Sequence, residues 1–126
     1  MILKQKIIKR SDLRANADVY YVFGDNTKRV GMGGQAGEMR GEPNAFGIPT
    51  KRLPSQYDDS FFSDEDFEEV KIIIDKHINE LEKIVRNGHI VVIPQDGLGT
   101  GLSELPTRAP KIFKYLESRL DYLETL

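Results

Sequence analysis

The sequence predicts a single α/β domain over residues 1–126, from the order of its patterns and the position of its glycines. Two apolar runs typical of buried strands, at 19–23 and 89–93, each lead directly into a glycine-rich loop. Helical patterns follow, and this order is typical of βαβ units with parallel strands covered by helices. The two loops, around residues 24–41 and 94–102, are therefore expected at the same edge of the sheet, where such folds bind ligands.

The first half of the chain is expected to supply most of the strands. Residues 3–9 have strand composition, and the β-branched and aromatic run at 19–23 is expected to stop at Gly24. Residues 44–49 offer a further short strand, and residues 52–60, which contain a proline, serines and aspartates, indicate a surface loop.

Two amphipathic helices are predicted in the second half. Ser63 is a good N-cap and is followed by acidic residues, which the helix macrodipole favours, while Asn87 and Gly88 supply a stop. The apolar positions of this helix recur at spacings of three and four: Phe67, Val70, Ile74, Ile78, Leu81 and Val85. The last helix is capped by Thr107 or a nearby residue, and its apolar stripe comprises Ala109, Ile112, Phe113, Leu116, Leu120 and Leu123.

The composition favours a soluble globular protein. Hydrophobic residues make up 39% and charged residues 30%, and no apolar stretch approaches the roughly 20 residues that a membrane span needs. The charged first residues do not resemble a signal peptide, so we expect a cytoplasmic location. The chain has no cysteine, and His77 and His89 are not spaced as a metal pair, so we predict no disulfide, no metal site and no cofactor.

The charge balance argues against an extended nucleic-acid surface but leaves room for a local anion site. Eighteen basic and 20 acidic residues give a net charge of −2, which offers no electrostatic grip on a long phosphate backbone. Several basic residues nevertheless fall near most of the glycines: Lys28, Arg29, Arg40, Lys51 and Arg52.

The first glycine-rich segment is a candidate phosphate-binding loop. Glycine lets backbone N–H groups turn toward a phosphate, and most of the chain's 11 glycines lie between residues 24 and 47. The segment matches neither the Walker A nor the Rossmann spacing, and a merely tight connection is the alternative interpretation. We predict ligand contacts from Asp25, Gly31, Gly33, Gly34 and Gln35.

The second glycine-rich segment is expected to bind the same ligand. Its predicted contacts are Gly97, Leu98, Gly99, Thr100 and Gly101, and the alternative is a plain surface turn. Asp96 precedes these glycines and is the candidate general base.

Three strings together resemble the macro domain, a family that binds ADP-ribose and related nucleotides. They are Phe23-Gly24-Asp25-Asn26, residues 31–36 and residues 93–101. The resemblance implies a three-layer α/β/α domain with a mostly parallel mixed sheet. It also implies a small-molecule ligand of the ADP-ribose class, with ADP-ribosylated macromolecules as further partners.

The resemblance also suggests residue roles. Asn26 would approach the distal ribose, Gly33 and Gly34 would lie against the ligand, and residues 97–101 would surround phosphate. One branch of the family uses a lysine and an aspartate, for which Lys28 and Asp96 are the counterparts, so the catalytic candidates are Asp96, Asn26 and Lys28. The usual Asn-Ala-Ala-Asn turn is replaced by Gly-Asp-Asn-Thr, and the only candidates for an adenine-reading acid are Asp12 and Asp18.

The expected function is therefore binding of ADP-ribose or a related nucleotide diphosphate through the two loops. Hydrolysis of a bond at the distal ribose, either de-ADP-ribosylation or ADP-ribose 1″-phosphate dephosphorylation, is the enzymatic extension. A non-catalytic nucleotide sensor and an interaction domain with purely structural glycine loops are the alternatives.

Overall fold

The computed structural model describes residues 1–126 and contains one four-stranded sheet. The strands are β1 (Ile2–Gln5), β2 (Tyr20–Asn26), β3 (Ala45–Lys51) and β4 (Val91–Pro94). Their spatial order is β1-β4-β2-β3, and every adjacent pair is parallel. The expected α/β class is confirmed, and the sheet is parallel throughout rather than mixed.

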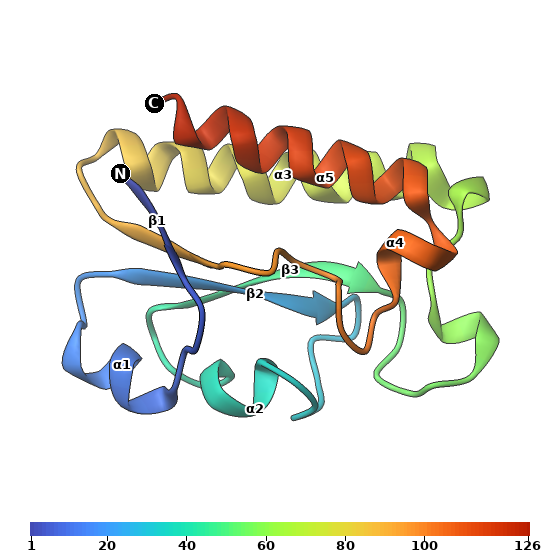
Figure 1. Ribbon diagram of the computed structural model, residues 1–126, viewed down its shortest axis with the longest axis horizontal. Coiled ribbons are helices and arrows are strands. Elements are labelled where there is room, and N and C mark those ends of the chain that lie inside the picture. The colour runs from blue at the N-terminus through green and yellow to red at the C-terminus, as the bar shows by residue number, and fades with distance from the viewer.

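Helices cover both faces of the sheet, which gives three layers (Figure 1). The long helices α3 (Phe67–Arg86) and α5 (Pro110–Glu124) lie side by side on one face, and the short helices α1 (Arg10–Ala15) and α2 (Ala36–Met39) lie on the other. The core under the long helices contains 17 buried hydrophobic residues and the opposite core contains 7, so most apolar burial stabilises the α3–α5 face.

Helix α3 follows its predicted pattern. Ser63 and Asp66 form a capping box at the 3₁₀ turn η2 (Asp64–Asp66), which leads directly into α3. The predicted apolar positions are buried, with Phe67 half-buried, and Gly88 ends the helix with φ of +92°. The predicted strand at 89–93 is confirmed as β4 with its limits shifted to Val91–Pro94.

Thr107 is not the cap of the last helix; the N-cap residue is the nearby Ala109, whose side chain makes no capping hydrogen bond. Thr107 lies inside a separate short helix, α4 (Leu105–Arg108), and α5 begins at Pro110. The Asp64 carboxylate accepts hydrogen bonds from the N–H groups of Lys111 and Ile112, at 3.0 and 3.3 Å. A carboxylate distant in the sequence thus caps α5, which a local pattern could not reveal.

Strand β2 runs further than predicted, and this matters for the site. It includes Gly24, Asp25 and Asn26 because β3 pairs with it along this stretch, from Tyr21 opposite Ala45 to Asn26 opposite Lys51. A register shift between Asp25 and Asn26 interrupts the pairing. Asp25 and Asn26, which were expected in a turn, therefore belong to a strand that is paired within the sheet.

The N-terminal region also differs from the prediction. The first strand was expected over residues 3–9 but ends at Gln5, where the Gln5 side chain donates to the Ile7 carbonyl. Helix α1 was not predicted. Its first turn is held by Asp12, whose carboxylate accepts from the Lys9 N–H at 2.9 Å and from the Gln5 side chain at 3.0 Å.

Candidate functional site

Two loops follow neighbouring parallel strands and meet at the carboxyl edge of the sheet. We call residues 27–35, after β2, the first glycine loop, and residues 95–104, after β4, the second glycine loop. A cavity of about 290 Å³, the main cavity, lies between them. Its walls include Gly33, Gly34 and Gln35 of the first loop and residues 96–103 of the second. The structure therefore brings together most of the predicted ligand-binding residues.

The loops approach each other closely. A Cβ atom on Gly33 would lie 3.0 Å from Cδ1 of Leu102, and one on Gly24 would lie 3.4 Å from the backbone nitrogen of Gly99. In the second loop, Gly97 and Gly99 have φ of +86° and +78°, a backbone region that side chains disfavour. These glycines are required by the geometry of the cavity wall.

The backbone N–H groups of both loops are largely free. No N–H from Val30 to Ala36 donates a hydrogen bond within the chain, and the same is true of residues 98–103. Free amides on loops that line a cavity form an anion-binding surface when they converge. Without a bound anion, each free N–H group needs a water molecule as its acceptor, because an unpaired N–H is costly once it is buried.

A second, smaller cavity of about 60 Å³ adjoins the main one. Gly24, Gly33, Leu102 and Ser103 line both. The small cavity lies at the ends of β2 and β3, and its charged lining groups are Asp25, Arg40 and Lys51. Gly31, a predicted ligand contact, lines this cavity and not the main one.

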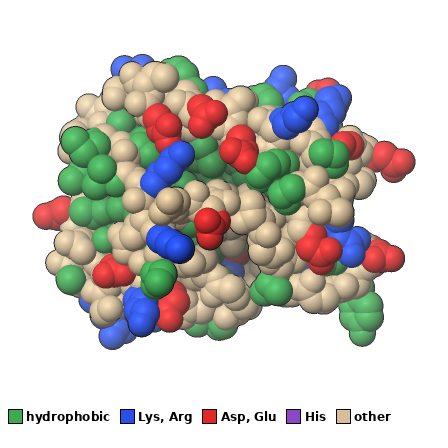
Figure 2. Space-filling view, viewed as in Figure 1, with side chains coloured by type: hydrophobic (Ala, Val, Ile, Leu, Met, Phe, Trp, Pro, Cys, Tyr) green, Lys and Arg blue, Asp and Glu red, His purple; other side chains and the backbone are tan.

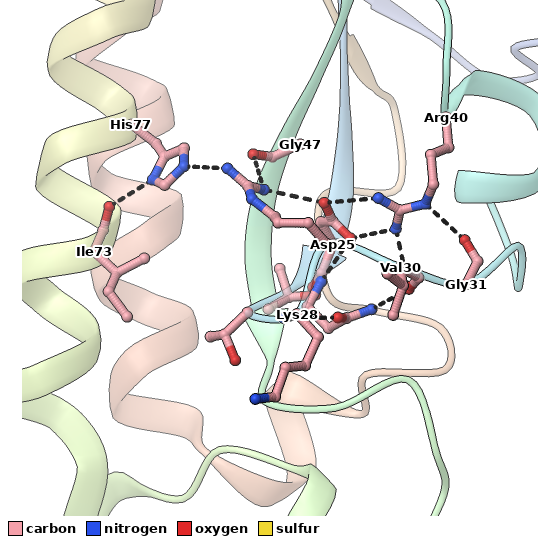
Figure 3. Close-up of polar contacts among 12 residues, drawn as sticks. Asp25, Lys28, Val30, Gly31, Arg40, Gly47, Ile73 and His77 are labelled. Carbon is pink, nitrogen blue, oxygen red and sulfur yellow. Dashed lines mark hydrogen bonds and ion pairs between the residues drawn. The ribbon is translucent and has the colours of Figure 1, made fainter.

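Asp25 is buried and its carboxylate is held by two arginines (Figure 3). Arg29 Nη1 donates to Oδ2 at 3.0 Å, and Arg40 donates to both carboxylate oxygens. The Asn26 N–H donates to Oδ1 at 2.8 Å. Arg29 also donates to the Gly47 carbonyl and contacts His77 on α3, so His77 packs against this network as a partly buried residue.

Asn26 and Lys28 have different surroundings from those expected. The Asn26 side chain donates to the Val30 carbonyl at 2.7 Å and accepts from the Lys28 N–H at 3.0 Å, so it organises the start of the first loop. The Lys28 side chain is exposed, lines neither cavity and points away from Asp25 in Figure 3. The Lys28 side chain therefore shares no cavity with Asp96, the other titratable catalytic candidate.

Lys51, which sequence reasoning grouped only with the local basic residues, is the buried lysine of the site. It is 5% exposed, its Nζ donates to the Ser55 carbonyl at 2.7 Å, and it lies 4.5 Å from the centre of the Phe61 ring. No carboxylate pairs with it within 4.0 Å. Burial lowers the pKa of Lys51; Glu104 opposes this shift, and Arg108 adds a smaller lowering effect. No feature of the sequence separated Lys51 from the other basic residues near the glycines.

Asp96 and Gln35 are polar side chains at the main cavity without partners in the chain. Asp96 is exposed and accepts no hydrogen bond, so its carboxylate is accessible. The Gln35 Oε1 atom is buried and accepts no hydrogen bond. The two acids suggested for adenine recognition, Asp12 and Asp18, line neither cavity.

Acidic and basic side chains are interspersed on the face of the molecule shown in Figure 2, so this face carries no large patch of one charge.

No group of three or more His, Cys, Asp or Glu side chains is placed to hold a metal ion. None of the helices combines the length and apolar composition needed to cross a bilayer.

Comparison with known proteins places the chain in a family without giving an activity. Residues 3–119 match DUF7831, described as a family of unknown function. No curated protein and no solved structure matches the chain.

Proposed function

The chain belongs to DUF7831, a family of unknown function, and from its cavity we propose that it binds ADP-ribose or a related nucleotide diphosphate. One observation carries this proposal: two glycine loops with free N–H groups line the same cavity of about 290 Å³. Free amides on two loops that line one cavity favour a phosphate-bearing ligand over a neutral one. The macro-like sequence strings then favour the ADP-ribose class among phosphate ligands.

The size of the cavity suggests which part of the ligand it holds. Its volume lies just below the roughly 300–1,000 Å³ typical of small-molecule sites. A diphosphate with one ribose fits this space better than a whole dinucleotide does. We propose that the diphosphate lies between the loops, that the distal ribose points toward the small cavity, and that the adenosine lies over the rim.

The first test is a thermal-shift screen against ADP-ribose, ADP-ribose 1″-phosphate, NAD, AMP and cyclic nucleotides. A ligand at about 100 times its Kd stabilises the folded state by about 2.7 kcal/mol, which raises Tm by about 10 °C in a domain of this size. We expect such a shift with ADP-ribose. No shift at millimolar ADP-ribose would contradict the proposal, and a shift with another nucleotide alone would reassign the ligand.

Lys51 favours a second, enzymatic proposal: hydrolysis at the distal ribose of the bound ligand. The resembled macro-domain branch uses a lysine and an aspartate, but the Lys28 side chain is exposed and lines neither cavity. Lys51 lines the small cavity, and Asp96, with no partner in the chain, lines the main one. We therefore assign the lysine role to Lys51 and keep Asp96 as the candidate acid–base group. The substrates that we propose for this reaction are ADP-ribosylated macromolecules. We also propose that the protein is located in the cytoplasm.

The variant Lys51→Met tests this assignment. We expect the variant to retain ADP-ribose binding and to lose at least about 100-fold in turnover. Its Tm at pH 7 should be higher than that of wild type, because an apolar chain replaces a buried cation that has no carboxylate partner.

The pKa of Lys51 is lower in the folded protein than in the unfolded chain, so the unfolded chain binds more protons at pH values between the two pKa values. The wild-type free energy of unfolding therefore rises as pH rises through the folded pKa toward 10.5, and the Tm difference shrinks.

The measurements are chromatographic detection of released ADP-ribose and Tm as a function of pH. Lys28→Met is the matched control, because Lys28 is exposed and outside both cavities. Wild-type turnover in Lys51→Met would remove Lys51 from the reaction. Wild-type protein that binds ADP-ribose but leaves every ADP-ribosylated substrate intact would favour the sensor alternative.

A further inference from the structure

Two free amides of the first glycine loop, those of Gly31 and Met32, follow carbonyl groups that are held by side chains. The Val30 carbonyl accepts from Asn26 Nδ2 at 2.7 Å and from Arg40 Nη2 at 3.3 Å, and the Gly31 carbonyl accepts from Arg40 Nε at 2.7 Å. In a planar trans peptide the N–H points opposite to the carbonyl of the preceding residue. The N–H groups of Gly31 and Met32 therefore point away from the carbonyl-holding side chains, and neither donates within the chain.

Arg40 is itself held by the Asp25 carboxylate and by the carbonyls of Val30 and Gly31 (Figure 3). Its Nη atoms form a fork on the Asp25 carboxylate, whose side chain is 3% exposed, and its guanidinium lies 5.5 Å from the centre of the Phe23 ring. Gly47 makes room for this arrangement, because a Cβ atom there would lie 2.7 Å from Oδ2 of Asp25. A planar five-donor group can hold a carboxylate and two carbonyls at once, which a lysine ammonium cannot do in the same geometry.

The charge of this cluster also favours an anion nearby. One buried carboxylate faces two guanidinium groups, Arg29 and Arg40, so the cluster beside the first loop keeps a positive excess. All of the Arg40 nitrogen atoms already donate within the protein, so this arginine acts on a ligand through the loop and through its field.

We propose that Arg40, held by Asp25, is a positioning residue: it turns the carbonyls of Val30 and Gly31 aside, fixes the direction of the Gly31 and Met32 amides, and so sets the path of the loop into Gly33, Gly34 and Gln35, which line the main cavity. This inference rests on the proposed function and adds a residue to it from outside the two glycine loops. Asn26 assists Arg40 through the Val30 carbonyl.

The test compares Arg40→Lys with the matched control Arg52→Lys. Arg52 also pairs with carboxylates, Glu69 at 3.1 Å and Asp66 at 3.2 Å, and lies 5.4 Å from the Phe62 ring centre, but it lines neither cavity. In the ligand-free protein, Arg40→Lys should shift the ¹⁵N and ¹H resonances of Gly31 and Met32 and leave the α5 amides unchanged. Its ADP-ribose affinity should fall by about tenfold or more, because the amides lose their fixed direction. Arg52→Lys should do neither.

A second variant, Asn26→Ala, tests the same idea if Arg40→Lys does not fold. Asn26→Ala removes the other donor to the Val30 carbonyl and leaves the Arg40–Asp25 pair in place, so it should weaken binding in the same direction by a smaller factor. Wild-type affinity and unchanged Gly31 and Met32 resonances in both variants would overturn the positioning role while leaving the proposed function intact. Failure of wild-type protein to bind ADP-ribose or inorganic pyrophosphate would overturn both.

Discussion

Gly33→Glu should abolish ADP-ribose binding and leave the fold intact. Gly33 lines both cavities, and a Cβ atom there meets only the end of the Leu102 side chain, which is exposed and flexible enough to move. The new carboxylate would lie among the free amides, where a phosphate is expected. Two like charges about 4 Å apart repel by roughly 4 kcal/mol at an effective dielectric constant of 20, so affinity should fall by about 100-fold or more.

Isothermal titration of the variant with ADP-ribose measures this loss. Ile72→Glu is the control, because it adds the same charge at an exposed position of α3 remote from both cavities. An affinity of Gly33→Glu within about threefold of wild type would mean that the ligand does not lie between the loops.

Asp25→Ala should be the most destabilising substitution at the site. It would leave Arg29 and Arg40 without their carboxylate, and breaking a buried pair by removing one partner costs roughly 3–5 kcal/mol. Arg29 is 44% exposed and can regain water, so we expect about 3 kcal/mol and a fall in Tm of about 10 °C.

Urea denaturation of Asp25→Ala against Asp58→Ala checks the effect. Asp58 also pairs with an arginine, Arg108 at 3.3 Å, but its side chain is 96% exposed, and surface pairs contribute about 0–1 kcal/mol. Equal unfolding free energies in the two variants would show that the Asp25 cluster is not a stabilising network.

The sequence predicted the elements whose patterns are local and complete. Helix α3 carries both its cap at Ser63 and its stop at Gly88, with an unbroken apolar spacing between them, and it formed as expected. The meeting of the two glycine loops followed from topology, because strands that are parallel end at the same edge.

The parts that were missed depend on partners distant in the chain. Asp25 looked like a turn residue because its strand pairing with β3 and its bond to Arg40 both come from later segments. The cap of α5 comes from Asp64, which lies on the turn before α3. The sequence could not distinguish Lys28 from Lys51, because both are basic residues near the glycines. Only the folded structure shows that Lys51 is buried and lines the small cavity while Lys28 faces solvent.

The central claim, that both glycine loops bind one phosphate-bearing ligand, is tested most directly by titrating ¹⁵N-labelled protein with ADP-ribose and following the backbone amides. The proposal predicts that resonances from Val30 to Ala36 and from Leu98 to Ser103 move together with a single saturating dependence on ligand, while those of α5 stay in place. Movement of one loop alone, or saturation with no change in either loop, would contradict it.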